Sequence, residues 1–215
     1  MRLPRDAYYT PEWAVRIFLD RYLPGMEEPI TIMDPCVGYG AMPLALLSYF
    51  DDWEIPENLT KLYFTDIDLD SQLFTHDRLQ ERGFTRYEFS GTPDDDYLLN
   101  DFTPEVDLTI MNPPYKVALP FIQKALTHSK TVAALLRVGF LEARKRTPWL
   151  IENMPDVYLL NKRPKFIEET IDKTNGEPRK VDTDATAYAW MVWTRDSPQE
   201  IGVIEILDAS DDQLA

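Results

Sequence analysis

The chain has 215 residues, of which 44% are hydrophobic and 12% aromatic. This length suits a single domain, and the even spread of apolar residues excludes disorder for the bulk of the chain. No apolar run approaches the roughly 20 residues that span a bilayer, and Cys36, the one cysteine, cannot form an internal disulfide. We therefore expect a soluble, cytoplasmic protein of one domain, residues 1–215, with no metal site and no membrane segment.

The charge is unevenly distributed. The net charge is −15, from 22 basic and 37 acidic side chains, and such a chain repels polyanions at long range. Residues 137–180, however, hold 10 basic and 7 acidic side chains and so carry a charge of +3. Any contact with nucleic acid is therefore expected in this segment.

Strand-like and helix-like segments alternate along the chain. Thr10 has the form of a helix N-cap, with Pro11 at the first helical position. Helices are expected over 11–23, 41–50, 69–82, 118–128 and 142–153. Strands are expected over 30–33, 61–65, 84–89, 106–111, 132–136, 157–160, 185–194 and 201–207. This alternation predicts an α/β fold with a doubly wound, mostly parallel sheet and helices on both faces.

Polar residues and glycines gather where four of the expected strands end. These positions are 34–40, 66–68, 101 and 112–115. In doubly wound sheets, ligands bind beyond the carboxyl ends of the strands, near the point where the strand order reverses. The four strand ends therefore predict one binding site.

The first of these strand ends is a glycine-containing loop that runs from Asp34 through Gly38 to Gly40. It lacks the third glycine of a dinucleotide fingerprint, and its leading acid suits a cationic or amino-bearing ligand. Taken alone, a plain tight turn explains the loop equally well.

Two further acids suit a nucleoside. A carboxylate at the position of Asp66 can accept hydrogen bonds from a ribose diol. Asp101 and Phe102 place a carboxylate beside an aromatic face, as an adenine ring requires, although an acidic loop with one core phenylalanine is an equal alternative.

The strongest signal is Asn112-Pro113-Pro114-Tyr115, which follows an apolar strand. The two prolines stiffen the backbone and remove two N–H groups. The Asn112 side-chain oxygen and the Pro113 carbonyl can then accept both hydrogens of one planar amino group, while the Tyr115 ring offers a stacking surface. Such paired acceptors stabilise the nitrogen as it gains positive charge, which predicts attack by an amine on an electrophilic methyl group.

Together these motifs resemble the S-adenosylmethionine-dependent amino-methyltransferases, which have a Rossmann-like sheet with a C-terminal antiparallel strand. The closest resemblance is to DNA adenine-N6 methyltransferases of the small orphan kind found in phages and prophages, with a gamma-like order of motifs. Residues 9–11, 162–166 and 184–190 are similar to further motifs of this group.

The resemblance implies a role for each motif, with S-adenosylmethionine as cofactor and a flipped adenine of duplex DNA as substrate. The implied cofactor residues are Thr10, Pro11, Asp34, Cys36 and Gly38 around the methionine part, Asp66 at the ribose, and Ile67, Asp101 and Phe102 at the adenine. The implied catalytic residues are Asn112, Pro113, Pro114 and Tyr115, and Phe166 is the candidate for a second stacking face on the target base.

The chain departs from the resemblance because a large target-recognition domain is missing. Residues 163–184 are expected to form an inserted loop in its place. In this hypothesis the loop, with its Arg163 and Lys165, contacts phosphates together with Arg144, Lys145 and Arg146. Recognition then involves a short site, a protein partner or a homodimer. The alternatives are a methyltransferase for another planar amine, such as a protein glutamine or an rRNA base, and a non-catalytic acidic binding module.

Overall fold

The computed structural model describes residues 8–23, 30–52, 59–90, 92, 96–101, 103–164, 167–168, 186–196 and 202–209. Its centre is an eight-stranded sheet with the strand order β10-β7-β9-β6-β5-β2-β3-β4. The strands are β2 (Ile30–Asp34), β3 (Leu59–Phe64), β4 (Tyr87–Phe89), β5 (Val106–Met111), β6 (Ser129–Arg137), β7 (Asp156–Leu160), β9 (Tyr188–Thr194) and β10 (Ile204–Leu207).

Strand β9 runs antiparallel to both of its neighbours, β6 and β7, and every other pair in this sheet is parallel. The expected mostly parallel sheet with a C-terminal antiparallel strand is therefore confirmed. The expected edge strand near residue 204 is also present, as β10.

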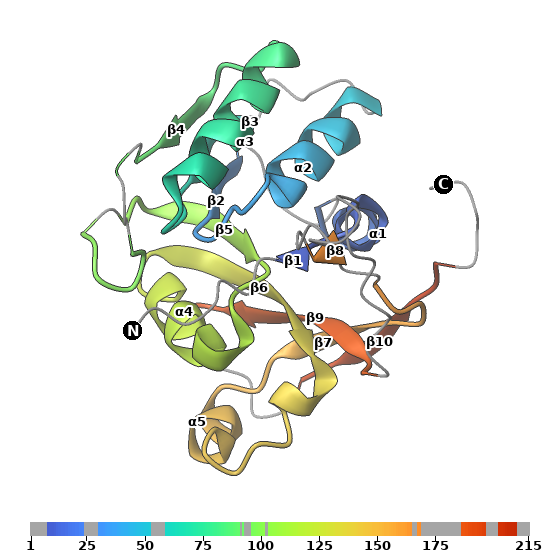
Figure 1. The fold of residues 1–215 in the computed structure, drawn as a ribbon. Coiled ribbons are helices and arrows are strands. Elements are labelled where there is room, and N and C mark those ends of the chain that lie inside the picture. The colour runs from blue at the N-terminus through green and yellow to red at the C-terminus, as the bar shows by residue number, and fades with distance from the viewer. Residues whose placement is uncertain are drawn as a thin grey trace, which may run out of the picture.

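Helices cover both faces of the sheet (Figure 1). The helices are α1 (Glu12–Tyr22), α2 (Ala41–Asp52), α3 (Leu69–Glu81), α4 (Ala118–Ala125) and α5 (Thr147–Glu152). Buried side chains of α1, α2 and α3 belong to one hydrophobic cluster, and those of α4 and α5 belong to another. Alternate residues of the inner strands face the two clusters, as Ile32 and Met33 of β2 do, so the sheet separates two cores. No helix of the described residues is long and apolar enough to cross a membrane.

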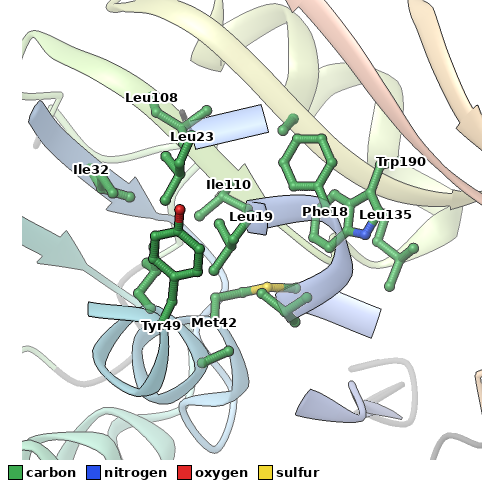
Figure 2. Packing of buried hydrophobic residues seen from close by; sticks show 14 of the residues in the cluster. Phe18, Leu19, Leu23, Ile32, Met42, Tyr49, Leu108, Ile110, Leu135 and Trp190 are labelled. Carbon is green, nitrogen blue, oxygen red and sulfur yellow. The ribbon is translucent and has the colours of Figure 1, made fainter. Parts of the chain in front are cut away.

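Helix α1 is fixed to the sheet by an aromatic contact (Figure 2). The ring of Phe18 stacks on that of Trp190 in β9, with centroids 4.6 Å apart. The Trp190 indole N–H donates to the carbonyl of Ala14 at 2.7 Å, so the buried tryptophan has its polar group satisfied. This contact holds the start of the described chain against its C-terminal part.

The order of the strands reverses between β2 and β5. From β2 the chain proceeds through β3 to β4 at one edge and then returns to β5 on the other side of β2. The carboxyl ends of β2 and β5 are therefore the switch point, and they carry Asp34 and, one residue beyond β5, Asn112.

Two expected helix starts were wrong. Helix α1 begins at Glu12 and not at residue 11, because the carbonyl of Pro11 accepts the first turn's bond from Ala14 N–H, at 3.0 Å. The helix expected over 142–153 begins only at Thr147, since the residues before it form a turn that is closed by the bond from Arg146 N–H to the Ala143 carbonyl, at 2.8 Å.

The segment expected as an inserted loop, 163–184, contains one short element among its described residues. Two of its residues, Ile167–Glu168, form strand β8, which pairs antiparallel with β1 (Tyr8–Tyr9) in a separate two-stranded sheet. A strand pair of only two residues on each side, far apart in sequence, is too short to show a hydrophobic periodicity, so the sequence does not predict it.

Candidate active site

The loop after β2 contains a buried carboxyl group. The Asp34 side chain is 1% exposed, and its Oδ1 accepts from the Cys36 N–H at 3.1 Å. Its Oδ2 is buried and has no hydrogen-bond partner among the described residues. Burial raises the pKa of Asp34 to about 8, the charge of Asp66 adds to the rise, and the bond from Cys36 opposes it. A cationic group placed at Oδ2 would satisfy this oxygen and favour the ionised form.

Two glycines give the loop its shape. Gly38 has φ +50° and Gly40 has φ +79°, both in the left-handed region that glycine adopts without strain. A Cβ on Gly40 would lie 2.9 Å from Oγ1 of Thr75, whereas one on Gly38 would meet nothing within 4 Å. The Thr75 hydroxyl donates to the Gly38 carbonyl at 3.2 Å, so helix α3 fixes the position of the loop. The space next to the Gly38 Cα remains accessible.

Asp66, after β3, is tied to the same loop. Its Oδ2 accepts from the Gly38 N–H at 2.9 Å, and its Oδ1 accepts from the Asp68 N–H at 2.9 Å. The next residue, Ile67, is 44% exposed. The structure therefore brings the two acidic strand ends together and leaves an apolar side chain accessible beside them.

The 96–101 segment is anchored to α4. Lys124 Nζ donates to the carbonyls of Tyr97 and Asn100 at 2.5 and 2.6 Å. The Tyr97 hydroxyl shares a hydrogen bond of 2.6 Å with His128 Nε2. Asp101, at the end of this segment, is exposed. The structure thus fixes the segment that carries Asp101, while Phe102 lies outside the described residues.

The side chain of Asn112 is held by the start of the chain. Its Nδ2 donates to the buried Thr10 Oγ1 at 3.0 Å, across 102 residues of sequence. Its Oδ1 accepts no hydrogen bond from any residue that the structure describes. Backbone of Asn112 also bonds the Cys36 thiol, whose pKa is raised well above its usual value, first by burial and then by the charges of Asp34 and Asp66. The two loops of the switch point therefore touch.

The two prolines and Tyr115 follow directly. The carbonyl of Pro114 accepts from the Val117 N–H at 2.9 Å and so closes the 3-10 turn Tyr115–Val117. Pro113 is buried and its carbonyl is not part of this turn. Tyr115, the first residue of this turn, is half-buried and packs against both hydrophobic clusters.

A cavity of about 260 Å³ opens beside Tyr115. It is lined by Tyr115, Leu136, Arg137, Gly139, Phe140, Arg146 and Thr186. The guanidinium carbon of Arg137 lies 5.0 Å from the centre of the Tyr115 ring, and that of Arg146 lies 4.3 Å from the centre of the Phe140 ring. Sequence reasoning named Arg146, with Arg144 and Lys145, as a phosphate contact but did not predict that Arg146 and Arg137 line one cavity, because that arises only from the fold.

The remaining expected substrate residues are not gathered in this cavity. Arg144 and Arg163 are exposed and do not line it. Lys165 and Phe166 lie outside the described residues. Their neighbour Ile167 pairs with Tyr9, which precedes Thr10, so the described residue that follows Phe166 is joined to the chain that supports Asn112.

Comparison with known proteins identifies the fold. No protein-family model and no curated protein matches the chain. A methyltransferase subunit of a type I restriction-modification system from Streptococcus thermophilus superposes with a TM-score of 0.66 at 16% identity, over 90% of this chain and 46% of that one. A dimethyladenosine transferase from Plasmodium falciparum gives 0.55 at 17% identity, over 90% and 63%. TrmK from M. capricolum, bound to S-adenosylhomocysteine, gives 0.52 at 9% identity, over 89% and 71%.

The fold is the Rossmann-like methyltransferase fold. The chain spans less than half of the restriction-modification subunit and less than two thirds of the dimethyladenosine transferase. At these identities the likeness concerns the fold, so the chemistry of the site rests on this chain's own residues.

Proposed function

We propose that this protein transfers a methyl group from S-adenosylmethionine to the exocyclic N6 amine of adenine in DNA. The observation that carries the proposal is the orientation of Asn112. Its amide NH2 is engaged by Thr10, so its Oδ1 is directed away from that bond and can accept a hydrogen bond, as the carbonyl of the following residue, Pro113, also can. Two acceptors at the switch point of a methyltransferase fold suit a planar amine.

The residues at the end of β2 and β3 fit the cofactor. The unsatisfied Oδ2 of Asp34 suits the ammonium group of its methionine part, and the space at Gly38 allows close approach to backbone. Asp66 suits the ribose, and the exposed Ile67 suits the apolar face of the adenine. Bound there, S-adenosylmethionine supplies an electrophilic methyl carbon on a sulfonium. In this proposal Thr10 supports Asn112, a role different from the cofactor contact that the resemblance implies.

The reaction then depends on how the acceptor amine is held. Its two hydrogens bond to Asn112 Oδ1 and the Pro113 carbonyl, and its ring stacks on Tyr115. The nitrogen lone pair forms the new N–C bond while the C–S bond breaks and its electrons remain on sulfur. The two acceptors stabilise the positive charge that develops on nitrogen, and the amine then loses a proton to water. No side chain has to act as a general base.

Adenine in DNA is favoured over other planar amines by the restriction-modification neighbour and by the basic segment 137–180. In the proposal residues 163–184 act as a reduced recognition element, with Arg163, Lys165 and Phe166 toward the target and Arg144 on nearby phosphates. A protein partner or a second copy supplies further recognition if this element is too small.

The decisive experiment is incubation with tritiated S-adenosylmethionine and DNA, RNA or cell protein, followed by identification of the labelled atom. Label on adenine N6 of DNA supports the proposal, and label on RNA, on protein glutamine or on no substrate contradicts it. Asn112→Ala should abolish transfer and leave the affinity for S-adenosylhomocysteine intact. Asn153→Ala is the matched control, because that amide donates to the Trp149 carbonyl within α5 at 3.0 Å and should leave transfer unchanged.

A further inference from the structure

We propose that the cavity beside Tyr115 binds one phosphodiester group of the substrate strand, through Arg137 and Arg146. The inference rests on the proposed function and deepens it, since it identifies the substrate as a nucleic acid from two arginines that none of the sequence motifs contains. Tyr115 belongs both to the amine-holding corner and to the cavity wall, so the phosphate would lie next to the target base.

Arg137 is positioned before any ligand arrives. It is the last residue of β6, and its Nε donates to the Tyr188 hydroxyl at 3.2 Å. Its guanidinium also lies over the Tyr115 ring. A guanidinium held by a ring and a hydroxyl loses little conformational freedom when it binds an anion.

Arg146 is positioned independently, by the loop between β6 and α5. Its Nε donates to the Phe140 carbonyl at 2.8 Å and its Nη2 to the Gly139 carbonyl at 3.3 Å. These bonds use two of the five N–H groups of a guanidinium, so donors remain for a ligand. Arginine forks match the oxygens of phosphate, which two converging guanidinium groups can bind from two sides.

The charge of the cavity supports an anionic ligand. Of the seven described residues that line it, two are arginines and none is an acid, and Thr186 adds a hydroxyl. Glu142, the only acid between Gly139 and Arg146 in sequence, is exposed and does not line the cavity. In a chain of net charge −15 a local positive site of this kind attracts phosphate at short range only. A protein substrate methylated on glutamine would bring no anion to these two arginines, because the glutamine side chain and the peptide groups on either side of it are neutral.

The test uses short duplexes that carry one target adenine and one neutral methylphosphonate, moved stepwise along the backbone. Binding of each duplex to the full chain is measured with saturating S-adenosylhomocysteine. We expect one position beside the target adenine to weaken binding roughly 10-fold or more. In Arg137→Gln and Arg146→Gln this sensitivity should disappear, and the slope of log K against log salt should fall by about 1.

Arg195→Gln is the matched control, because it removes the same charge from an arginine that pairs with Glu105 at 3.0 Å, beside the amino end of β6. It should keep the positional sensitivity. If the wild-type protein binds every methylphosphonate duplex as tightly as the unmodified duplex, the inference is overturned. This result does not depend on whether any variant folds. Label on adenine N6 without positional sensitivity contradicts this phosphate site and leaves the proposed reaction standing. Positional sensitivity without methyl transfer supports the phosphate site and contradicts the reaction.

Discussion

Asp34→Asn tests how the raised pKa of the buried Asp34 carboxyl changes the free energy of unfolding with pH. Burial raises the pKa of this carboxyl from 3.8 to about 8 in the folded chain. A pKa that differs by one between the folded and unfolded chain corresponds to about 1.4 kcal/mol of stability. A raised pKa means that the group's contribution to stability is complete below about pH 4 and is lost as the pH rises toward 8. The wild-type free energy of unfolding should therefore lose about 3 kcal/mol from this group between pH 5 and pH 7.

Asparagine removes this dependence. Its Oδ1 can keep the bond from the Cys36 N–H, and no charge has to be buried. Urea unfolding of both proteins without ligand, at pH 5, 6, 7 and 8, should show the variant gaining on the wild type by about 1.4 kcal/mol per pH unit. A difference that stays constant with pH would refute the reasoning, because Asp34 would then titrate normally.

Asp107→Asn provides a control of opposite sign. Burial acts to raise the pKa of Asp107, but bonds from Lys130 and Thr31 outweigh it, so the pKa is lowered. This group stabilises the fold above its usual pKa and stops doing so in acid. The substitution should therefore destabilise the protein at neutral pH and have less effect near pH 3.

The same Asp34 carboxyl should control ligand binding. If the ammonium of the cofactor lies at Asp34 Oδ2, binding requires the ionised form, and the affinity for S-adenosylhomocysteine should rise up to about tenfold per pH unit as the pH approaches 8. Calorimetric titration of wild type and Asp34→Asn at pH 6 and pH 8 measures this. Equal affinities at both pH values in the wild type would place the ammonium elsewhere.

Three further substitutions probe the supports of the site. Thr10→Val should lower kcat about fivefold, since the Asn112 amide loses a hydrogen bond worth about 1 kcal/mol. Thr10→Ser keeps the hydroxyl and should restore kcat. A changed cofactor affinity with normal kcat would contradict this role of Thr10. Gly40→Ala should lower Tm by about 2–8 °C, from about 1–2 kcal/mol of left-handed strain and the contact with Thr75, and Thr75→Ala should recover part of the loss in a thermal melt. Lys124→Met should weaken S-adenosylhomocysteine binding severalfold by releasing the 96–101 segment, and an unchanged Kd would exclude that segment from the cofactor site.

Much of the fold follows from sequence periodicity, because regular elements carry a local signal. Strand β5 begins and ends where the apolar run from Val106 to Met111 predicts, and the polar strand ends then meet at the switch point as parallel strands require. Elements fixed by distant contacts carry no such signal. Thr10 has the residue type of a helix cap, yet its hydroxyl serves Asn112, because a partner 102 residues away competes with the local backbone.

The site shows the same division. The motif at Asn112 is readable because its chemistry lies in consecutive residues. The cavity cannot be read in this way, since Arg137 and Arg146 have the spacing of an ordinary basic segment and come to line one cavity with Tyr115 only in the folded chain. His128 likewise carries no local signal of its burial, since it is 3% exposed and bonds to a tyrosine, Tyr97, that lies 31 residues away in sequence.

The short pairing of β1 with β8 has a consequence for synthesis of the protein. Tyr9 precedes the residue that holds Asn112, and its partner Ile167 is made on the ribosome much later. A growing chain therefore contains residues 112–115 long before it contains the strand that pairs with Tyr9. The segment that supports Asn112 can therefore take up its final pairing only after translation has passed β8.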